Sequence, residues 1–458
     1  MKKLVALLLC LMMVVPATLA SAETAEGKVL NIWCWNDEFQ SRFNAYYPEV
    51  KEIAEDKSTT TLNDGTIVKW TINPNEGNNY QNKLDEALRA QESAAADDKI
   101  DIFLIEADYA LKYVDSPYTL DVKADIGLTD EDLGGQYKYT QEIATSADGK
   151  LKAVTWQATP GLFAYRRSIA KDVLGTDDPD AVQEALSDWD KFNAVAEQAA
   201  AKGYYMLSGY DDAYRTFSNN VSAPWVADDG ETVVVDANLM KWVDQTKLYT
   251  DKGYNHKSSL WDATWAADQG PTGKVFGFFY STWGINFTLL GNSLETSVAN
   301  GGKEEVGNGA YGDYAVCQGP QAYYWGGTWI CAAAGTDNVA TIKEVMQKLT
   351  CDAAIAKKIT EDTQDYTNNV AAMNELAQNY SSAFLGGQNH IALFAEAAPK
   401  IDMSNISAYD QGLNESFQGA FKNYFDGNAT IDEAKAQFES IISEKYPELV
   451  NFQWPDAE

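Results

Sequence analysis

Tryptophan and tyrosine residues stand beside amides and carboxylates at many places in this sequence. The chain has 13 Trp and 25 Tyr. A pyranose ring has apolar C–H faces that stack on aromatic rings, and equatorial hydroxyls that carboxylates and amides can bind. The pairing therefore predicts a carbohydrate-binding surface. The pairs in predicted turns are Trp35-Asn36-Asp37, Trp156-Gln157, Tyr210-Asp211-Asp212, Trp225, Trp283-Gly284 and Tyr324-Trp325-Gly326-Gly327.

Each tryptophan also has a competing explanation, because indole rings fill protein cores. Trp70 lies inside a strand pattern and Trp329 lies inside the apolar run TWICAAA, so we assign both to the core. Trp261 and Trp265 stand four residues apart, a spacing that one face of a helix would also produce. The aromatic content therefore indicates a kind of ligand without identifying each residue that contacts it.

Groups able to catalyse a reaction are scarce. The two histidines, His256 and His390, occur in neither an HExxH nor an HxH spacing, and no GxSxG, Walker loop or GxGxxG follows a predicted strand. Carboxylate pairs are expected by chance among 67 Asp and Glu residues. The sequence therefore predicts no catalytic residue, no metal site and no cofactor, and it favours a binding protein over an enzyme.

Charge and cysteine content exclude further classes. The formal net charge of −32 would repel nucleic acid and anionic membranes. The cysteines after the N-terminal segment lie singly and far apart, so we expect buried free thiols rather than a disulfide framework or a zinc site. These cysteines are Cys34, Cys317, Cys331 and Cys351.

Residues 1–22 have the pattern of a secretory signal peptide, with a basic start, an apolar run over 4–15 and an A-x-A site that ends at Ala22. Cys10 does not fit a lipid-anchor motif, because Leu9 precedes it where a small residue is needed. We therefore expect an exported protein that works in the periplasm or at the cell surface without a lipid anchor.

The elements that position the first aromatic cluster can be read from the alternation of apolar residues. Leu30, Ile32 and Cys34 alternate with polar and aromatic residues, which predicts a strand. Asn36 or Asp37 is then a suitable N-cap for a helix. The cluster thus lies where the carboxyl end of a strand meets the start of a helix, and ligands bind at that edge of open α/β sheets.

The rest of the chain continues the α/β pattern. A hairpin, a helix and a buried strand that ends in Glu106 and Asp108 complete a doubly wound unit. A strand, a Pro160-Gly161 interruption and a second apolar run then lead into a different region. Further elements are predicted as a hairpin at 59–74, helices at 79–95, 188–202 and 236–253, strands at 98–109, 276–287 and within 314–338, and mostly helix over 339–458.

Taken in order, these segments resemble the extracellular solute-binding proteins of ABC importers, in particular the large carbohydrate-binding group that includes maltodextrin-binding proteins (family 1). The resemblance covers nearly all of the chain after the signal peptide. The segments that carry it are LNIWCWNDEF (30–39), DIFLIEADYALKYVDS (101–116), VTWQATPGLFAYRRSIAKDVLG (154–175), GFFYSTWGI (277–285) and YYWGGTWICAAAGTDN (323–338).

The resemblance implies a two-lobe, type II periplasmic-binding-protein fold, in which hinge crossovers join the lobes and the ligand cleft lies between them. The N-terminal lobe would comprise 29–153 plus 318–350, and the C-terminal lobe 154–317 plus 351–458. The implied ligand-binding residues are Trp35, Asn36, Asp37, Glu38, Asp108, Trp156, Gln157, Tyr210, Asp211, Asp212, Trp225, Trp283 and Trp325.

The chain departs from the family pattern at two places. Arg166-Arg167 is the polar pair where the family usually has Asn-Lys, and Asp37-Glu38 replaces the Asp-Lys of some members, which bears on the ligand. The more acidic cleft favours a neutral oligosaccharide over uronic or sialic acids. The implied partners are this ligand and the membrane permease subunits of an ABC transporter, and we expect a monomer.

Two other classes of function remain open at this point. A secreted glycoside hydrolase would share the aromatic residues and would use two of the carboxylates. An importer receptor for a peptide, a polyamine or another non-sugar ligand would use the excess of acid to attract a cation.

Overall fold

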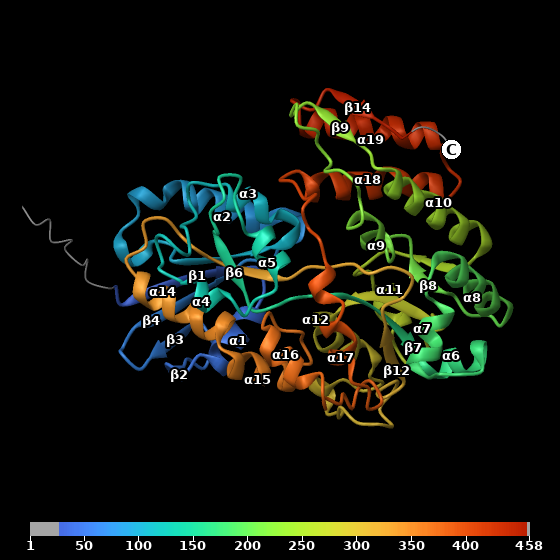
Figure 1. Cartoon of the computed structure of the whole chain (residues 1–458), viewed down its shortest axis with the longest axis horizontal. Helices are drawn as coiled ribbons and strands as arrows, with labels where there is room; N and C mark the ends of the chain where they lie inside the picture. The colour runs from blue at the N-terminus through green and yellow to red at the C-terminus, as the bar shows by residue number, and fades with distance from the viewer. Residues whose placement is uncertain (1–26, 456–458) are drawn as a thin grey trace, which may run out of the picture.

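Two β-sheets of different size organise the chain in the computed structural model, which describes residues 27–455 (Figure 1). The larger sheet has the strand order β2-β3-β4-β1-β5-β13-β6, and the smaller has the order β11-β7-β12. The remaining pairs are β10-β8 and β14-β9. The strands are β1 Val29–Cys34, β2 Val50–Ile53, β3 Thr59–Leu62, β4 Ile67–Ile72, β5 Ile102–Glu106, β6 Ala153–Thr155, β7 Gly161–Arg166, β8 Leu207–Gly209, β9 Thr232–Val234, β10 Asn255–Ser258, β11 Gly277–Ser281, β12 Tyr314–Cys317, β13 Thr328–Ala332 and β14 Asn451–Gln453.

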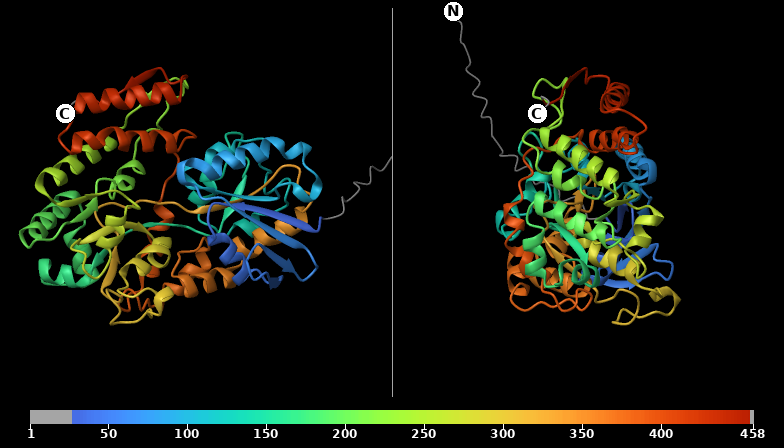
Figure 2. Two further views of the ribbon diagram at one scale, coloured as in Figure 1. Left: turned by 180° about the vertical axis from the view of Figure 1, so that it is seen from behind. Right: turned by 90° about the vertical axis from the view of Figure 1, so that its right-hand side faces the viewer.

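The helices fall into two groups around these sheets (Figures 1 and 2). Those around the larger sheet are α1 Glu38–Tyr46, α2 Asn79–Ala90, α3 Ala110–Val114, α4 Asp130–Leu133, α5 Lys138–Ile143, α14 Val339–Met346 and α15 Ala353–Thr363. Those on the other side are α6 Arg167–Leu174, α7 Pro179–Ala185, α8 Trp189–Ala201, α9 Tyr214–Ser218, α10 Ala237–Lys252, α11 Ala263–Asp268, α12 Thr282–Gly284, α13 Gly291–Ser293, α18 Asp410–Phe425 and α19 Ile431–Lys445. Between the groups lie α16 Val370–Leu376 and α17 His390–Ala395.

The first strand and helix form as their sequence predicts. Along β1, Leu30, Ile32 and Cys34 are buried, and the residues between them are only half-buried. Parallel pairing with β4 on one side and β5 on the other places β1 inside the sheet. Asp37 takes the N-cap position of α1, but the side chain of Asn36 accepts the hydrogen bond from the backbone nitrogen of Glu38 at 3.1 Å.

Other predicted elements are also confirmed, with shifted ends. The hairpin of β3 and β4 turns at Gly65, whose φ of +88° suits a glycine. The helix predicted at 79–95 is α2, which ends at Ala90. The strand predicted at 276–287 is shorter, because β11 ends at Ser281 and helical turns follow.

Two crossing segments, residues 156–160 and 318–327, join the sheets. The first connects β6 to β7 and the second connects β12 to β13, which inserts between β5 and β6 of the larger sheet. The segments touch each other through a bridge between Pro160 and Tyr324. The lobe boundaries expected from the sequence stay a prediction. Contacts also run between the two expected lobes, because α15 packs against α1 and Tyr46 donates a hydrogen bond to Asp362 at 3.1 Å.

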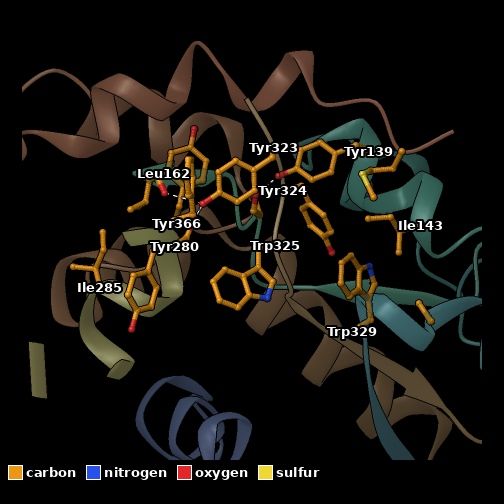
Figure 3. Close-up of a cluster of buried hydrophobic side chains, with 14 of the residues drawn as sticks. Tyr139, Ile143, Leu162, Tyr280, Ile285, Tyr323, Tyr324, Trp325, Trp329 and Tyr366 are labelled. Atoms are coloured by element: carbon orange, nitrogen blue, oxygen red, sulfur yellow. Dashed lines mark hydrogen bonds between the residues drawn. The ribbon is translucent and has the colours of Figure 1, made fainter. Parts of the chain in front are cut away.

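Aromatic side chains fill the interior around the crossing segments (Figure 3). The hydroxyl of Tyr323 donates to the backbone oxygens of Leu162, at 2.7 Å, and of Tyr280. A Cβ on Gly161 would stand 2.5 Å from the Tyr323 ring, so this position has no room for a larger residue. Trp329 is fully buried here, which confirms its assignment to the core.

The cysteines, Trp70 and, within the described residues, the absence of a membrane-spanning helix can also be compared with the sequence-based expectations. Cys34, Cys317 and Cys331 are buried free thiols, and Cys351 is a partly buried one. Trp70 is only partly buried, with its ring against Phe39 and Phe43. Within residues 27–455, no helix combines the length and the apolar composition needed to cross a membrane. The predicted signal peptide lies outside the described residues.

Candidate ligand-binding cleft

A cavity of about 360 Å³ lies where the carboxyl ends of β1 and β5 meet the two crossing segments. Aromatic rings line it together with carboxylates and amides. The aromatic lining residues are Trp35, Tyr109, Trp261, Trp283, Phe287 and Trp325. The other lining residues are Asn36, Glu38, Asn75, Glu106, Asp108, Gln157, Arg215, Gly326, Gly327, Thr328, Gln411 and Glu415.

The structure brings together residues that are far apart in the sequence. The turn after β1, the turn after β5, both crossing segments and α12 each contribute to this one cavity. The residues predicted from the sequence that line it are Trp35, Asn36, Glu38, Asp108, Gln157, Trp283 and Trp325.

Two residues of the first clusters lie away from the cavity. Asp37 is exposed at the start of α1 and is not among the lining residues. Trp156 is 2% exposed and packs at 5.3 Å against the ring of Phe39, so its indole belongs to the core. Successive side chains of an extended segment point to opposite sides, which places Trp156 inside and its neighbour Gln157 in the cavity.

The cluster Tyr210-Asp211-Asp212 anchors a loop and does not line the cavity. The Tyr210 hydroxyl donates to Asp426 at 2.6 Å. Asp211 accepts a hydrogen bond from the backbone nitrogen of Leu260 at 3.0 Å, and Asp212 accepts two from the backbone just before it. These side chains thus bond within the protein, although one Asp212 oxygen is buried without a partner in the described part of the chain. Trp225 is buried and lines a second cavity, described below.

Several lining residues lacked a clear signal in the sequence. Trp261 is the most exposed of them, at 57%, and stacks on Trp283 with ring centroids 6.2 Å apart and planes 15° apart. The alternative that Trp261 and Trp265 share a helix face is wrong, because α11 begins at Ala263 and Trp261 has a left-handed φ of +71°. What marks Trp261 as a lining residue is its exposure in a loop, and exposure cannot be read from the sequence.

Trp261, Trp283 and Trp325 form one wall of the cavity, and contacts between them fix its geometry. The indole nitrogen of Trp283 donates to the backbone oxygen of Trp325 at 3.0 Å, and the two rings meet edge to face at 5.5 Å. Across the cavity, Trp35 is held edge-on by Tyr80 and Tyr109. The indole faces are therefore positioned before any ligand arrives.

Glycines make the close approach of this wall possible. Gly326 has φ +71°, and a Cβ there would stand 3.1 Å from the indole nitrogen of Trp283. Gly327 has φ +108°, a conformation that residues with side chains rarely adopt. The Gly326-Gly327 pair thus lets the second crossing segment run directly under Trp283.

Gln157 links the polar edge of the cavity. Its amide nitrogen donates to Glu38 at 2.9 Å and to Asp365 at 3.0 Å, and its oxygen accepts from the backbone nitrogen of Thr328 at 3.0 Å. Burial raises the pKa of Glu38 to about 7, and the nearby charge of Arg42 opposes this shift. The amide therefore fixes one carboxyl group that faces the cavity.

A second carboxyl group, Glu106, lies at the end of β5. One of its oxygens accepts a hydrogen bond from the backbone nitrogen of Asp108 at 2.7 Å. Burial, and then the charge of Asp108, raise the pKa of Glu106 to about 8. The Asp108 carboxylate itself is paired with Arg215 of α9 at 2.8 and 2.5 Å. Burial thus favours the protonated form of Glu106, which can donate as well as accept.

Among residues 27–455, no group of three or more His, Cys, Asp and Glu side chains is placed to hold a metal ion. Aromatic faces beside hydrogen-bonding groups are instead suited to binding a polyhydroxy compound by stacking and hydrogen bonding.

Comparisons with solved structures agree with this fold. A protein described as extracellular solute-binding protein family 1 superposes with a TM-score of 0.68 at 15% identity, covering 91% of this chain and 99% of that one. A binding protein of an ABC transporter from B. animalis subsp. lactis, in complex with beta-1,6-galactobiose, gives 0.65 at 16% identity, covering 93% and 100%. The GacH receptor of Streptomyces glaucescens, solved with acarbose, gives 0.64 at 15% identity, covering 93% and 99%.

These superpositions establish the fold, and the predicted type II binding-protein architecture is confirmed. No curated protein sequence matches the chain. The sequence profile described as "Bacterial extracellular solute-binding protein" matches residues 57–374, which is well over half of the chain. This chain is a member of the bacterial extracellular solute-binding protein family.

Proposed function

We propose that the protein captures an oligosaccharide in the cavity described above and delivers it unaltered to the permease subunits of an ABC transporter. The observation that carries this proposal is the wall of Trp261, Trp283 and Trp325 that faces the carboxyl groups. Saccharides stack on such faces and hydrogen-bond at such edges. The sugar ligands of the similar structures, beta-1,6-galactobiose and acarbose, support the same class.

Capture would proceed by closure of two lobes about the crossing segments. The larger sheet supplies Trp35, Glu38 and Glu106, whereas Trp283 and Arg215 come from the other side. A ligand that contacts both sides stabilises the closed arrangement by its differential affinity. We propose lobe boundaries at 29–153 plus 318–350 and at 154–317 plus 351–458, with α15 of the second lobe packed against α1 of the first.

The proposal extends to the cellular setting. The protein would be exported by the segment at residues 1–22, act outside the cytoplasm as a monomer without a lipid anchor, and use no cofactor. It would bind its ligand without reaction and release it chemically unchanged.

The test is a binding screen followed by recovery of the ligand. Neutral oligosaccharides of several linkages, including beta-1,6-galactobiose and maltose, are tested by thermal shift and then by calorimetry, because a ligand of the native state raises the melting temperature. We expect saturable binding of at least one of them and recovery of the intact sugar. Absence of binding across the panel, or release of reducing ends at enzyme-like rates, would reject the proposal.

A cationic ligand is the second candidate, and one observation favours it. Four carboxyl groups, those of Glu38, Glu106, Asp108 and Glu415, line the cavity beside the guanidinium group of Arg215. Burial raises the pKa of Glu38 and of Glu106, and a bound cation would favour the ionised form of both. An ammonium group over an indole face would gain a cation–π interaction as well. Polyamines and basic peptides in the same screen separate the two candidates, since preferential binding of these cations would replace the oligosaccharide assignment.

A further inference from the structure

A second cavity of about 290 Å³ adjoins the first one. Of the described residues, only Asp108 and Arg215 line both cavities. The far cavity is otherwise lined by Ala107, by residues of α5, α9, β9, α10 and α18, and by the segments around residues 219–225, 322–324 and 401–406. The two cavities therefore adjoin at this pair of side chains, which we call the partition.

The partition is a well-formed ion pair. Both guanidinium nitrogens of Arg215 donate to the two oxygens of Asp108, at 2.8 and 2.5 Å. The guanidinium also lies 5.3 Å from the ring centroid of Trp325. Bidentate, charge-assisted pairs of this kind are stronger and more directional than neutral hydrogen bonds, so the pair holds its position.

One of the residues that line the far cavity, Tyr324, carries a hydrogen-bonding group that no other described residue uses. Tyr324 is 2% exposed, and its hydroxyl has no hydrogen-bond partner in the described part of the chain (Figure 3). The side-chain oxygen of Asn219 accepts a hydrogen bond from the backbone nitrogen of Tyr324, and that of Asn414 accepts from the side chains of Trp225 and Tyr214. A buried polar atom without a partner is costly, and a ligand hydroxyl would satisfy it.

We infer that the Asp108–Arg215 pair sets the length of saccharide that the protein accepts, and that the far cavity is an extension site for further sugar units when the pair is opened. This inference rests on the proposed function. A short ligand fills the aromatic cavity and ends at the pair. A longer ligand must separate two paired, partly buried charges, and that cost offsets the contacts it would gain beyond them.

The test compares affinities along ladders of increasing length. Malto-oligosaccharides and beta-1,6-galacto-oligosaccharides, each from the disaccharide to the hexasaccharide, are titrated by calorimetry into the wild type and into the double variant Asp108→Ala/Arg215→Ala. We expect the affinity of the wild type to stop rising at a short length. In the double variant, the ratio of affinities for long over short ligands should rise about tenfold, the effect of one added hydrogen bond or stacking contact of 1.4 kcal/mol.

Two further variants sharpen the result. Asp85→Ala/Lys112→Ala removes an exposed ion pair of 2.8 Å that lies outside both cavities, and it should keep the wild-type length profile. Tyr324→Phe, added to the double variant, should lose part of the gain for long ligands. If the double variant fails to fold, the charge-neutral Asp108→Asn/Arg215→Gln pair takes its place, with the same expected direction.

The outcomes separate this inference from the proposed function. An equal loss of affinity for all lengths would identify the pair as a clamp between the two sides and overturn its role in length selection. An unchanged length profile in the double variant would overturn the inference alone. If no ladder binds to the wild type, the proposed function fails and the inference fails with it.

Discussion

At the scale of single residues, tryptophan serves two purposes in this protein. Trp156 and Trp283 both stand beside polar residues in the sequence, yet the first is in the core and the second faces the cavity. The difference arises from the direction in which each backbone segment points its side chain. The consequence is a pair of substitutions with opposite expected effects.

Trp283→Ala should weaken oligosaccharide binding by about 1–3 kcal/mol, because it removes a stacking face, and should leave the melting temperature nearly unchanged. Calorimetric titration with the ligand found in the screen measures this. Trp156→Ala should instead lower the free energy of unfolding by about 3–5 kcal/mol, as for other buried aromatic residues. Undiminished affinity in Trp283→Ala would show that the ligand binds elsewhere.

The carboxyl group of Glu106 should make stability depend on pH. Its pKa is raised from 4.5 to about 8, chiefly by burial, so between these values the folded state keeps a proton that the unfolded chain releases. Stability relative to Glu106→Gln is therefore fully present below pH 4.5 and is lost as the pH rises through 8. Thermal unfolding of both proteins across this range should show that the stability of Glu106→Gln increases relative to that of the wild type as the pH rises.

Glu433 gives a control of opposite sign. Its pKa is lowered by hydrogen bonds from Thr430, first from the backbone and then from the side chain, at the start of α19. The stability that Glu433 adds relative to Glu433→Gln is thus present above pH 4.5 and lost as the pH falls below it. A flat difference between wild type and Glu106→Gln over the whole range would contradict the buried, protonated state of Glu106.

At the scale of elements, the second crossing segment shapes the aromatic wall. Gly326 and Gly230 share a φ of +71°, so an alanine at either position is strained to a similar degree. A Cβ on Gly326 would press on the Trp283 indole, whereas a Cβ on Gly230 would meet no atom within 4 Å. The two glycines therefore form a matched pair.

Gly326→Ala and Gly230→Ala should lower stability by a similar amount, about 1–2 kcal/mol, from the left-handed conformation alone. Only Gly326→Ala should also weaken ligand binding, because it displaces the indole that stacks on the sugar. Unfolding curves and calorimetry on both variants provide the two readouts. Equal affinities in the two variants would show that the crossing segment does not position the wall.

At the scale of the whole molecule, the proposed closure links ligand binding to shape and stability. A ligand at 100 times its dissociation constant should add about 2.7 kcal/mol to the free energy of unfolding. Small-angle scattering of the same sample should show a smaller radius of gyration than without ligand. Binding with unchanged scattering would mean that the two sides are already at their bound separation.

Local sequence determined most of the elements. The alternation around Leu30, the continuous apolar run at 102–105 and the Asn63-Asp64-Gly65 turn each predict the element that forms, because pattern and turn chemistry act over a few neighbouring residues. The ends of α2 and β11 shift because tertiary contacts, rather than local preference, decide where an element stops.

Local sequence also predicted the aromatic and polar character of the site, because aromatic residues stand beside amides and carboxylates in predicted turns. It could not determine which of them meet. Trp35, Gln157 and Trp283 share one cavity only because the crossing segments bring two sheets together. Asp212 instead accepts hydrogen bonds from the backbone of Ser208 and Gly209. Exposure, pairing and the partition by Asp108 and Arg215 depend on contacts between residues distant in the chain, which only the tertiary structure provides.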